Sequence, residues 1–244
     1  MGGRGIMGLV DEVRADEKLR GAARNEDANK IRDGVLERAK DEMIELAANV
    51  RVRPEEVEER TAEMFETAVF VAAAAAMVKE DKENKFDFFV MHHVNSSPFF
   101  VTINAQDWIP PETKARLLEW KIRMDLLQYA ARGAPMLSLD KLEAYQPRRP
   151  ELGNSLEEII ARLHDFEDDG HAIKLGRAAV VCRNICKKYE DEGKDWIKIK
   201  GDDMWKKVCH LIVDSVEAPG PHWVRSCGFD EAWKDVPNNQ DPKL

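Results

Sequence analysis

Over most of this chain the apolar residues recur at steps of three and four, and no other feature constrains the fold more. One such stripe consists of Ile31, Val35, Ala39, Met43 and Leu46. This period places side chains on one face of an α-helix, whereas a half-buried strand alternates apolar and polar residues. The alternating stretch 196–199 has only four residues, too few for a sheet. We therefore predict an all-α fold, an irregular multi-helix bundle in a single domain.

Proline and capping residues indicate where the helices begin and end. Pro54 is followed by two glutamates and predicts a helix start, because proline suits the first helical position and acidic side chains stabilise the positive end of the helix dipole. The segment 110–112 predicts a second start, and Gly133 and Pro135 predict its end. Ser155 and Glu158 form a capping box. Further helices are predicted over 173–186 and 203–216, the last ended by the prolines of 219–221.

The two ends of the chain lack this pattern. The first two dozen residues are glycine-rich and then charged, with weak periodicity. We predict a weakly ordered N-terminal tail over 1–26, a helical domain over 27–237 and a C-terminal tail over 238–244.

Charge and hydropathy exclude two classes of partner. The net charge of -9 argues against a nucleic-acid partner, which would require a basic face. The most apolar window, 69–78, is far too short to span a bilayer. We therefore expect a cytoplasmic protein with no membrane partner.

The four cysteines are Cys182, Cys186, Cys209 and Cys227. They lack the C-x2-C spacing of structural zinc sites, although Cys182 and Cys186 lie one helical turn apart. Reduced, packed thiols are favoured over metal ligands, because a free cysteine usually behaves as a small buried hydrophobe.

A polar segment, 92–97, interrupts an otherwise apolar stretch and begins with His92 and His93. If the stretch is buried, its polar groups need partners, because an unpaired buried polar group is costly. One interpretation is a functional pocket. The other is a set of satisfied core polar groups with a surface histidine, and composition alone favours it.

A second polar segment, 164–174, joins two predicted helices. On a continuous helix His171 and Lys174 share a face, with Cβ atoms about 5–6 Å apart, and His164 lies on roughly the same face. Such a face can bind a metal or carry a proton relay, with Asp168 and Asp169 orienting an imidazole N–H. The alternative is a solvated acidic junction, with Asp169 as a helix cap and Lys174 in a surface ion pair.

A third segment near the C-terminus combines aromatic residues with a cation, in Trp223 and Arg225 and in the run 228–233. Aromatic rings beside a guanidinium suit a flat apolar ligand, and the guanidinium can hold a phenolate. On pattern alone ordinary packing of the C-terminus is favoured.

Taken in order, these segments resemble the questin oxidase family of fungal secondary metabolism, over its C-terminal half. The stretches that carry the resemblance are 33–39, 87–97, 114–121, 166–174 and 223–233. The run from Asp168 to Lys174 and the closing run from Gly228 to Trp233 are the most specific of them.

The resemblance implies an oxygen-dependent oxidoreductase that opens an anthraquinone or polyketide ring, in a Baeyer–Villiger-like or dioxygenase-like reaction. It implies a non-haem iron(II) held by histidines and a carboxylated lysine, with NADPH as co-substrate; no flavin motif is present. Carried over to this chain, His92, His171 and Lys174 are the metal ligands, with His93 a less favoured substitute for His92. The expected catalytic residues are Lys174, His171 and Arg225. Imidazole and carbamate donors around an open position suit iron(II) and dioxygen.

One departure from the family concerns the ligand set. Family proteins are longer and carry further histidine ligands in their N-terminal halves, whereas residues 1–91 here contain no histidine. Three explanations are open. The missing ligands come from a companion chain or another copy, the protein is a truncated form, or its metal site has only three ligands. An exposed apolar face is expected where the missing half would pack. The alternatives kept open are a non-catalytic helical binding protein that retains the scaffold, and metal-free quinone binding by the Trp and Arg residues.

Overall fold

The computed structural model describes residues 5–239, and within this range every regular element is helical. The predicted all-α fold is therefore confirmed; the only extended pairings in these residues are two isolated bridges, Lys82 with Asn238 and Asp87 with Val224. The α-helices are α1 (Ile6–Ala15), α2 (Glu17–Ala22), α3 (Leu36–Arg38), α4 (Lys40–Ala48), α5 (Val57–Ala75), α6 (Phe88–Ser96), α7 (Pro98–Asn104), α8 (Pro111–Ala131), α9 (Leu139–Ala144), α10 (Leu156–Ala161), α11 (His171–Asp191) and α12 (Gly201–Glu217). A π-helical turn covers Lys30–Val35, and 3-10 turns cover Pro54–Glu56, Arg162–Asp165 and Asp230–Trp233.

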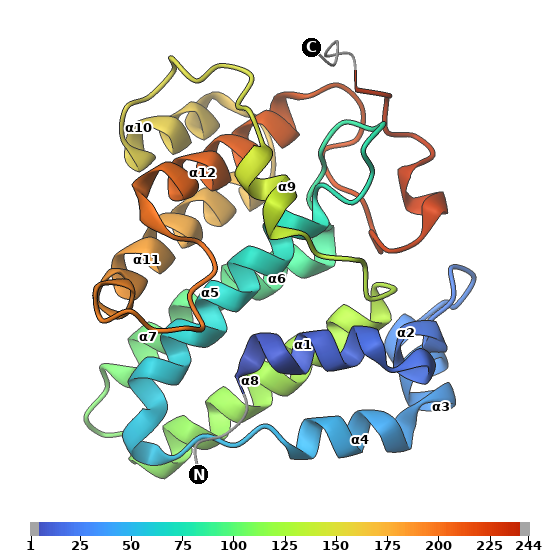
Figure 1. Cartoon of the computed structure of the whole chain (residues 1–244), viewed down its shortest axis with the longest axis vertical. Helices are drawn as coiled ribbons and strands as arrows, with labels where there is room; N and C mark the ends of the chain where they lie inside the picture. The colour runs from blue at the N-terminus through green and yellow to red at the C-terminus, as the bar shows by residue number, and fades with distance from the viewer. Residues whose placement is uncertain (1–4, 240–244) are drawn as a thin grey trace.

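Helix α5 forms the centre of the bundle. Almost every residue in it is buried, including the alanines of its last turns. Small side chains let neighbouring helices approach closely, and α5 packs against α6, α8 and α11. Figure 1 shows α5 between a group formed by α10, α11 and α12 and a group formed by α1 and α8. Helix α5 therefore links the two groups of helices.

Most predicted helix boundaries are confirmed. The turn at Pro54 leads directly into α5, and α8 begins at Pro111. The Ser155 hydroxyl accepts a hydrogen bond from the Glu158 N–H at 3.2 Å and so caps α10. The Glu158 carboxylate accepts from the Asn154 N–H instead of the Ser155 N–H, which leaves the predicted capping box half formed.

The predicted N-terminal tail over 1–26 is wrong for the residues that the structure describes. Helices α1 and α2 belong to the bundle, and Ile6, Leu9, Val10 and Val13 are buried in its core. The Ile6 N–H also donates to the Glu63 carboxylate at 2.6 Å. These four apolar residues have helical spacing, but the glycines and charges around them mask it. Residues 1–4 and most of the predicted tail over 238–244, namely 240–244, lie outside the described residues.

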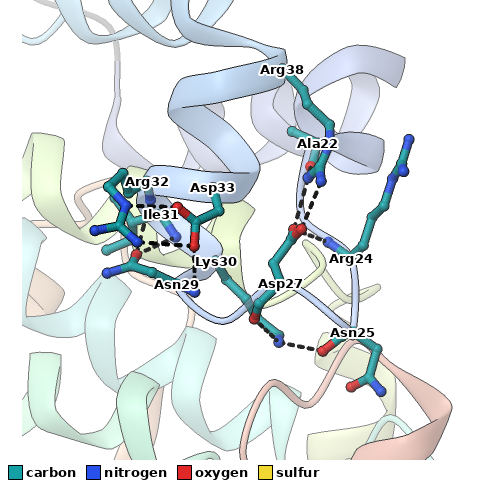
Figure 2. A network of polar contacts seen from close by, with 10 residues as sticks. All are labelled: Ala22, Arg24, Asn25, Asp27, Asn29, Lys30, Ile31, Arg32, Asp33 and Arg38. Carbon is teal, nitrogen blue, oxygen red and sulfur yellow. Dashed lines mark hydrogen bonds and ion pairs between the residues drawn. The ribbon is translucent and has the colours of Figure 1, made fainter.

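The stripe beginning at Ile31 is not one helix. The backbone of Ala39 leaves the helical region, with φ -142° and ψ 38°, and this separates the π-helical turn and α3 from α4. Figure 2 shows the polar contacts around this segment. Arg38 forms two hydrogen bonds to the Asp27 carboxylate, at 2.7 and 2.8 Å, and one to the Ala22 carbonyl. The Arg38 contact lowers the pKa of Asp27 to about 2. Tertiary contacts thus override a continuous helical pattern.

All four cysteines are free and buried, as predicted for packed thiols. The Cys182 and Cys186 sulfurs lie 3.9 Å apart in α11. As for the membrane, none of the helices in the described part of the chain combines the length and apolar character needed to cross one.

Glu66 makes the stability of the bundle depend on pH. It is fully buried in α5, where its carboxylate accepts the N–H groups of Lys198 and Ile199 at 2.8 and 2.9 Å, and burial raises its pKa to about 7. Between the ordinary and the raised pKa the folded state keeps a proton that the unfolded state has lost, so stability falls as pH rises. We expect the free energy of unfolding to drop by about 2 kcal/mol from about pH 5 to about pH 7.5. Urea denaturation of the wild type and Glu66→Gln checks this, because the glutamine variant should lack the drop.

Candidate histidine site

The site begins at the buried side chain of Asp87, which caps α6. One carboxylate oxygen accepts the N–H groups of Phe89 and Val90 at 2.8 and 3.1 Å, and the other accepts the Cys227 N–H at 2.7 Å. The backbone adds two bonds, from the Phe88 N–H to the Val224 carbonyl at 2.8 Å and from the Val224 N–H to the Phe86 carbonyl at 3.1 Å. The C-terminal segment 224–227 is therefore fixed to the first turn of α6.

This junction creates a cluster around the ring of Phe88. The ring centroids of His92 and His171 lie 4.7 and 5.1 Å from that of Phe88, and 5.0 Å from each other. The Arg225 guanidinium carbon lies 4.8 Å from the Phe88 ring centroid. We call Phe88, His92, His171 and Arg225 the histidine cluster. It joins three of the four site residues predicted from the sequence.

The hydrogen bonds of the two histidines fix which ring nitrogen is free. His92 Nδ1 contacts the Phe88 carbonyl oxygen, and His171 Nδ1 contacts the Asp169 carboxylate. A carbonyl and a carboxylate can only accept, so each neutral ring carries its proton on Nδ1 and has a free lone pair on Nε2. Metal-binding histidines are commonly held in this way. The contact with His171 also lowers the pKa of Asp169.

The two adjacent aspartates have different roles at the start of α11. The Asp168 carboxylate accepts the N–H groups of Gly170 and Ala172, at 2.6 and 2.8 Å, and therefore caps the helix. Asp169 contacts the His171 ring instead. The sequence left two roles open for Asp169. In the structure Asp169 contacts an imidazole and does not cap the helix.

The helix does not continue back to His164. Gly170 has φ +84°, a left-handed conformation that glycine adopts without strain, and α11 begins only at the next residue. His164 lies in the separate 3-10 turn and is exposed. The prediction that it shares a face with His171 is therefore wrong.

Lys174 lies in the first turn of α11, three residues after His171, as the spacing required. It is exposed, and its Cε lies 3.7 Å from the point where a Cβ on Gly170 would sit, so the side chain bends back over the helix start. Its charge helps to lower the pKa of Asp169. The amine thus lies near the turn that carries His171.

His93 points away from the cluster. Its Nδ1 contacts the Asp125 carboxylate in α8, which also accepts hydrogen bonds from Lys121 at 2.5 and 2.7 Å. Ser97 donates to the His93 carbonyl at 2.7 Å. The polar segment 92–97 therefore divides: His93 and Ser97 are satisfied core groups, and His92 belongs to the cluster.

The aromatic residues near the C-terminus mostly serve packing. Trp205 and Trp233 are buried, and the Trp233 indole N–H donates to the Cys227 carbonyl at 2.8 Å. His222 is exposed and packs its ring edge-on against Phe166, with centroids 4.7 Å apart. Of the predicted ligand-binding groups here, only Arg225 reaches the cluster.

The histidine cluster offers two imidazole side chains and lies apart from the cleft in the described part of the chain. No group of three histidine, cysteine or carboxylate side chains in residues 5–239 is placed to hold a metal ion. A cleft of about 510 Å³ lies elsewhere, between the starts of α5 and α8, helix α7 and the far end of α11. Its nearest α11 residue, Ile185, is 14 residues from His171, which is about 20 Å along a helix. His92 is exposed, whereas the side chain of His171 is only 14% exposed, so the pair lies at the edge of the surface.

Sequence reasoning missed the residues that build the cluster, Asp87 and Phe88. A signal was present, because an aspartate directly before an apolar run is a common N-cap. The contact between Asp87 and Cys227, which lies 140 residues away, has no such signal in the sequence.

These features define a helical protein with a paired-histidine surface site, and comparison with known proteins places it in a family. The family model described as Questin oxidase-like matches residues 2–179. The chain is 41% identical over 232 residues to the Baeyer-Villiger monooxygenase dmxR6 of Cryptosporiopsis sp., and 37% identical over 240 residues to the questin oxidase of Aspergillus fumigatus. These alignments cover 93% and 95% of this chain but 51% and 52% of the relatives. The chain belongs to the questin oxidase-like family and spans about half the length of the curated relatives it matches.

The family match begins before the domain boundary predicted at residue 27, in agreement with the packing of α1 and α2 into the bundle. That the matched region is the C-terminal half of the relatives stays a prediction.

Proposed function

We propose that this chain carries part of the metal site of an oxygen-dependent oxidoreductase that opens an anthraquinone or polyketide ring, in a Baeyer–Villiger-like or dioxygenase-like reaction. The observation that carries the proposal is the pair His92 and His171, with ring centroids 5.0 Å apart and both Nδ1 atoms already bonded. Relatives that share 34–41% of their aligned residues with the chain are named questin oxidase or Baeyer-Villiger oxidase or monooxygenase. Their names supply the reaction class.

The residues fit one side of an iron(II) site. His92 and His171 would bind through Nε2, and Lys174 would contribute an oxygen donor if carbon dioxide converts its amine to a carbamate. A lysine must be neutral for this reaction, and a nearby metal cation favours both the neutral amine and the resulting anion. When bound, iron(II) supplies activation of dioxygen towards an electron-rich ring. The remaining donors would come from a companion chain or from another copy of this one.

The other residues of the cluster would bind and orient the substrate. The Phe88 ring offers an apolar face to a flat polycyclic ligand. Arg225 is exposed and lies over that ring, where its guanidinium can pair with a phenolate oxygen. Asp169 would accept a hydrogen bond from His171 Nδ1, and this bond would keep the ring from turning away from a ligand. NADPH as co-substrate and a cytoplasmic location also remain proposals.

Iron content and oxygen incorporation test the proposal. The chain is co-expressed with the unmatched half of the Aspergillus fumigatus questin oxidase, loaded with iron(II) without oxygen, and then given ¹⁸O₂ and an anthraquinone. We expect about one iron per complex and a ring-opened product that contains ¹⁸O, with NADPH added in one arm to test its requirement. A complex that folds but binds no iron and yields no labelled product would overturn the proposal, and would favour a non-catalytic binding protein with the same scaffold.

Metal-free quinone binding makes a different prediction. It requires an anthraquinone to quench tryptophan fluorescence equally with and without iron, since Trp223 lies two residues from Arg225. Quenching that appears only with iron supports the oxidase.

A further inference from the structure

Helix α8 carries two opposite apolar faces. The inner face is buried in the core through Leu118, Ile122 and Leu126. The outer face, which we call the outer seam, consists of Leu117, Trp120, Met124 and Leu127. Leu117, Trp120 and Met124 are 39%, 57% and 46% exposed, whereas Leu127, at the end of the seam, is partly buried against the core. A helix that is apolar on both sides is typical of one that is covered on both sides.

The spacing of the outer seam indicates what would cover it. Its residues follow at steps of three, four and three, which is the a and d pattern of a helix that packs along another helix. At 100° per residue these positions centre about 180° from Leu118, Ile122 and Leu126. The three exposed seam side chains are only partly covered in the described fold, with the Arg123 guanidinium carbon 5.8 Å from the Trp120 ring centroid.

The charges beside the outer seam favour an acidic partner. Arg116 and Arg123 occupy the two g positions, whereas the e position holds Lys121, which is buried and paired with Asp125. In an antiparallel pair of copies the g positions face each other, so arginine meets arginine. Glu119 neutralises Arg123 within α8, at 2.9 Å, but Arg116 stays exposed. An acidic partner helix fits the exposed Arg116 better than a second antiparallel copy does.

We propose that the outer seam of α8 binds an amphipathic helix with acidic flanks, belonging to the half of the longer family members that this chain does not match. Those relatives have about twice the matched length, so they contain a further segment of similar size that can cover the outer seam. The proposal rests on the companion invoked for the proposed function and adds the surface that holds it.

Co-purification tests this surface without iron or substrate. The tagged chain is co-expressed with the unmatched half of the Aspergillus fumigatus questin oxidase, and the amount retained is measured. We expect the wild type to retain it, Leu117→Glu and Met124→Glu to reduce retention at least tenfold, and Arg116→Glu to reduce it less. Val181→Glu is the matched control, because Val181 is a 37% exposed apolar residue on α11, and it should retain the partner fully.

Three results would overturn the proposal. They are no retention by the folded wild type, equal retention by the seam variants, and a dimer of the chain alone that Met124→Glu dissociates in analytical ultracentrifugation. Because binding is measured in the absence of metal, a failure here is distinguishable from a failure of the oxidase proposal. Circular dichroism of each variant identifies any that has not folded.

Discussion

Replacing Asp87 with alanine is expected to lower the free energy of unfolding by about 4 kcal/mol. Asp87 is 1% exposed and accepts three backbone N–H groups, two at the start of α6 and one from Cys227. Loss of the cap costs about 1–2 kcal/mol, and an orphaned buried N–H costs about 1–3 kcal/mol more. Its charge also stabilises the buried guanidinium of Arg132, which the variant leaves uncompensated.

Urea denaturation measures this loss, with Asp16→Ala as the control. Asp16 caps α2 through one bond to the Leu19 N–H at 2.9 Å in a partly exposed setting, so its loss should cost about 1 kcal/mol. Similar losses in the two variants would mean that the junction between α6 and segment 224–227 contributes nothing beyond an ordinary cap. The cluster should suffer as well, because Arg225 lies in the segment that Asp87 holds.

The helices that sequence reasoning placed correctly are those with local signals at their ends. Pro54 and Pro111 mark helix starts through their own backbone geometry, which no distant contact needs to confirm. Helix α1 was missed because Ile6, Leu9, Val10 and Val13 lie among glycines and charges, and their burial depends on packing against α5 and α8. The break at Ala39 was not predictable either, since Arg38 is held by Asp27 and Ala22 from an earlier segment.

The site was predictable only in part for the same reason. The three-residue spacing of His171 and Lys174 is local, and it is preserved in α11. The contact between His92 and His171 joins residues 79 positions apart and depends on α6 packing against α11. Spacing alone left that contact undecided, and the resemblance to a family suggested it. Phe88, on which both rings pack, would have looked like any other core aromatic.

Iron binding should respond in a graded way to substitutions at the start of α11. His171→Ala removes one of the two proposed imidazole donors, and we expect iron(II) affinity to fall by at least about 100-fold. Asp169→Ala leaves the donor in place but frees its ring, and affinity should fall about 10- to 100-fold. Asp168→Ala removes the helix cap beside it, so it should cost about 1 kcal/mol of stability and change affinity little.

Anaerobic titration with iron(II), read by absorbance and by metal content after gel filtration, measures the affinities in the complex with the companion half. His222→Ala is the matched histidine control, because His222 is exposed and packs on Phe166 away from the cluster. Equal affinity in the wild type and His171→Ala would exclude the pair as ligands. Equal loss in Asp168→Ala and Asp169→Ala would mean that the helix start matters only as structure. A loss confined to Asp169→Ala would instead assign it the orientation of His171, since these adjacent aspartates differ in whether they hold the backbone or the imidazole.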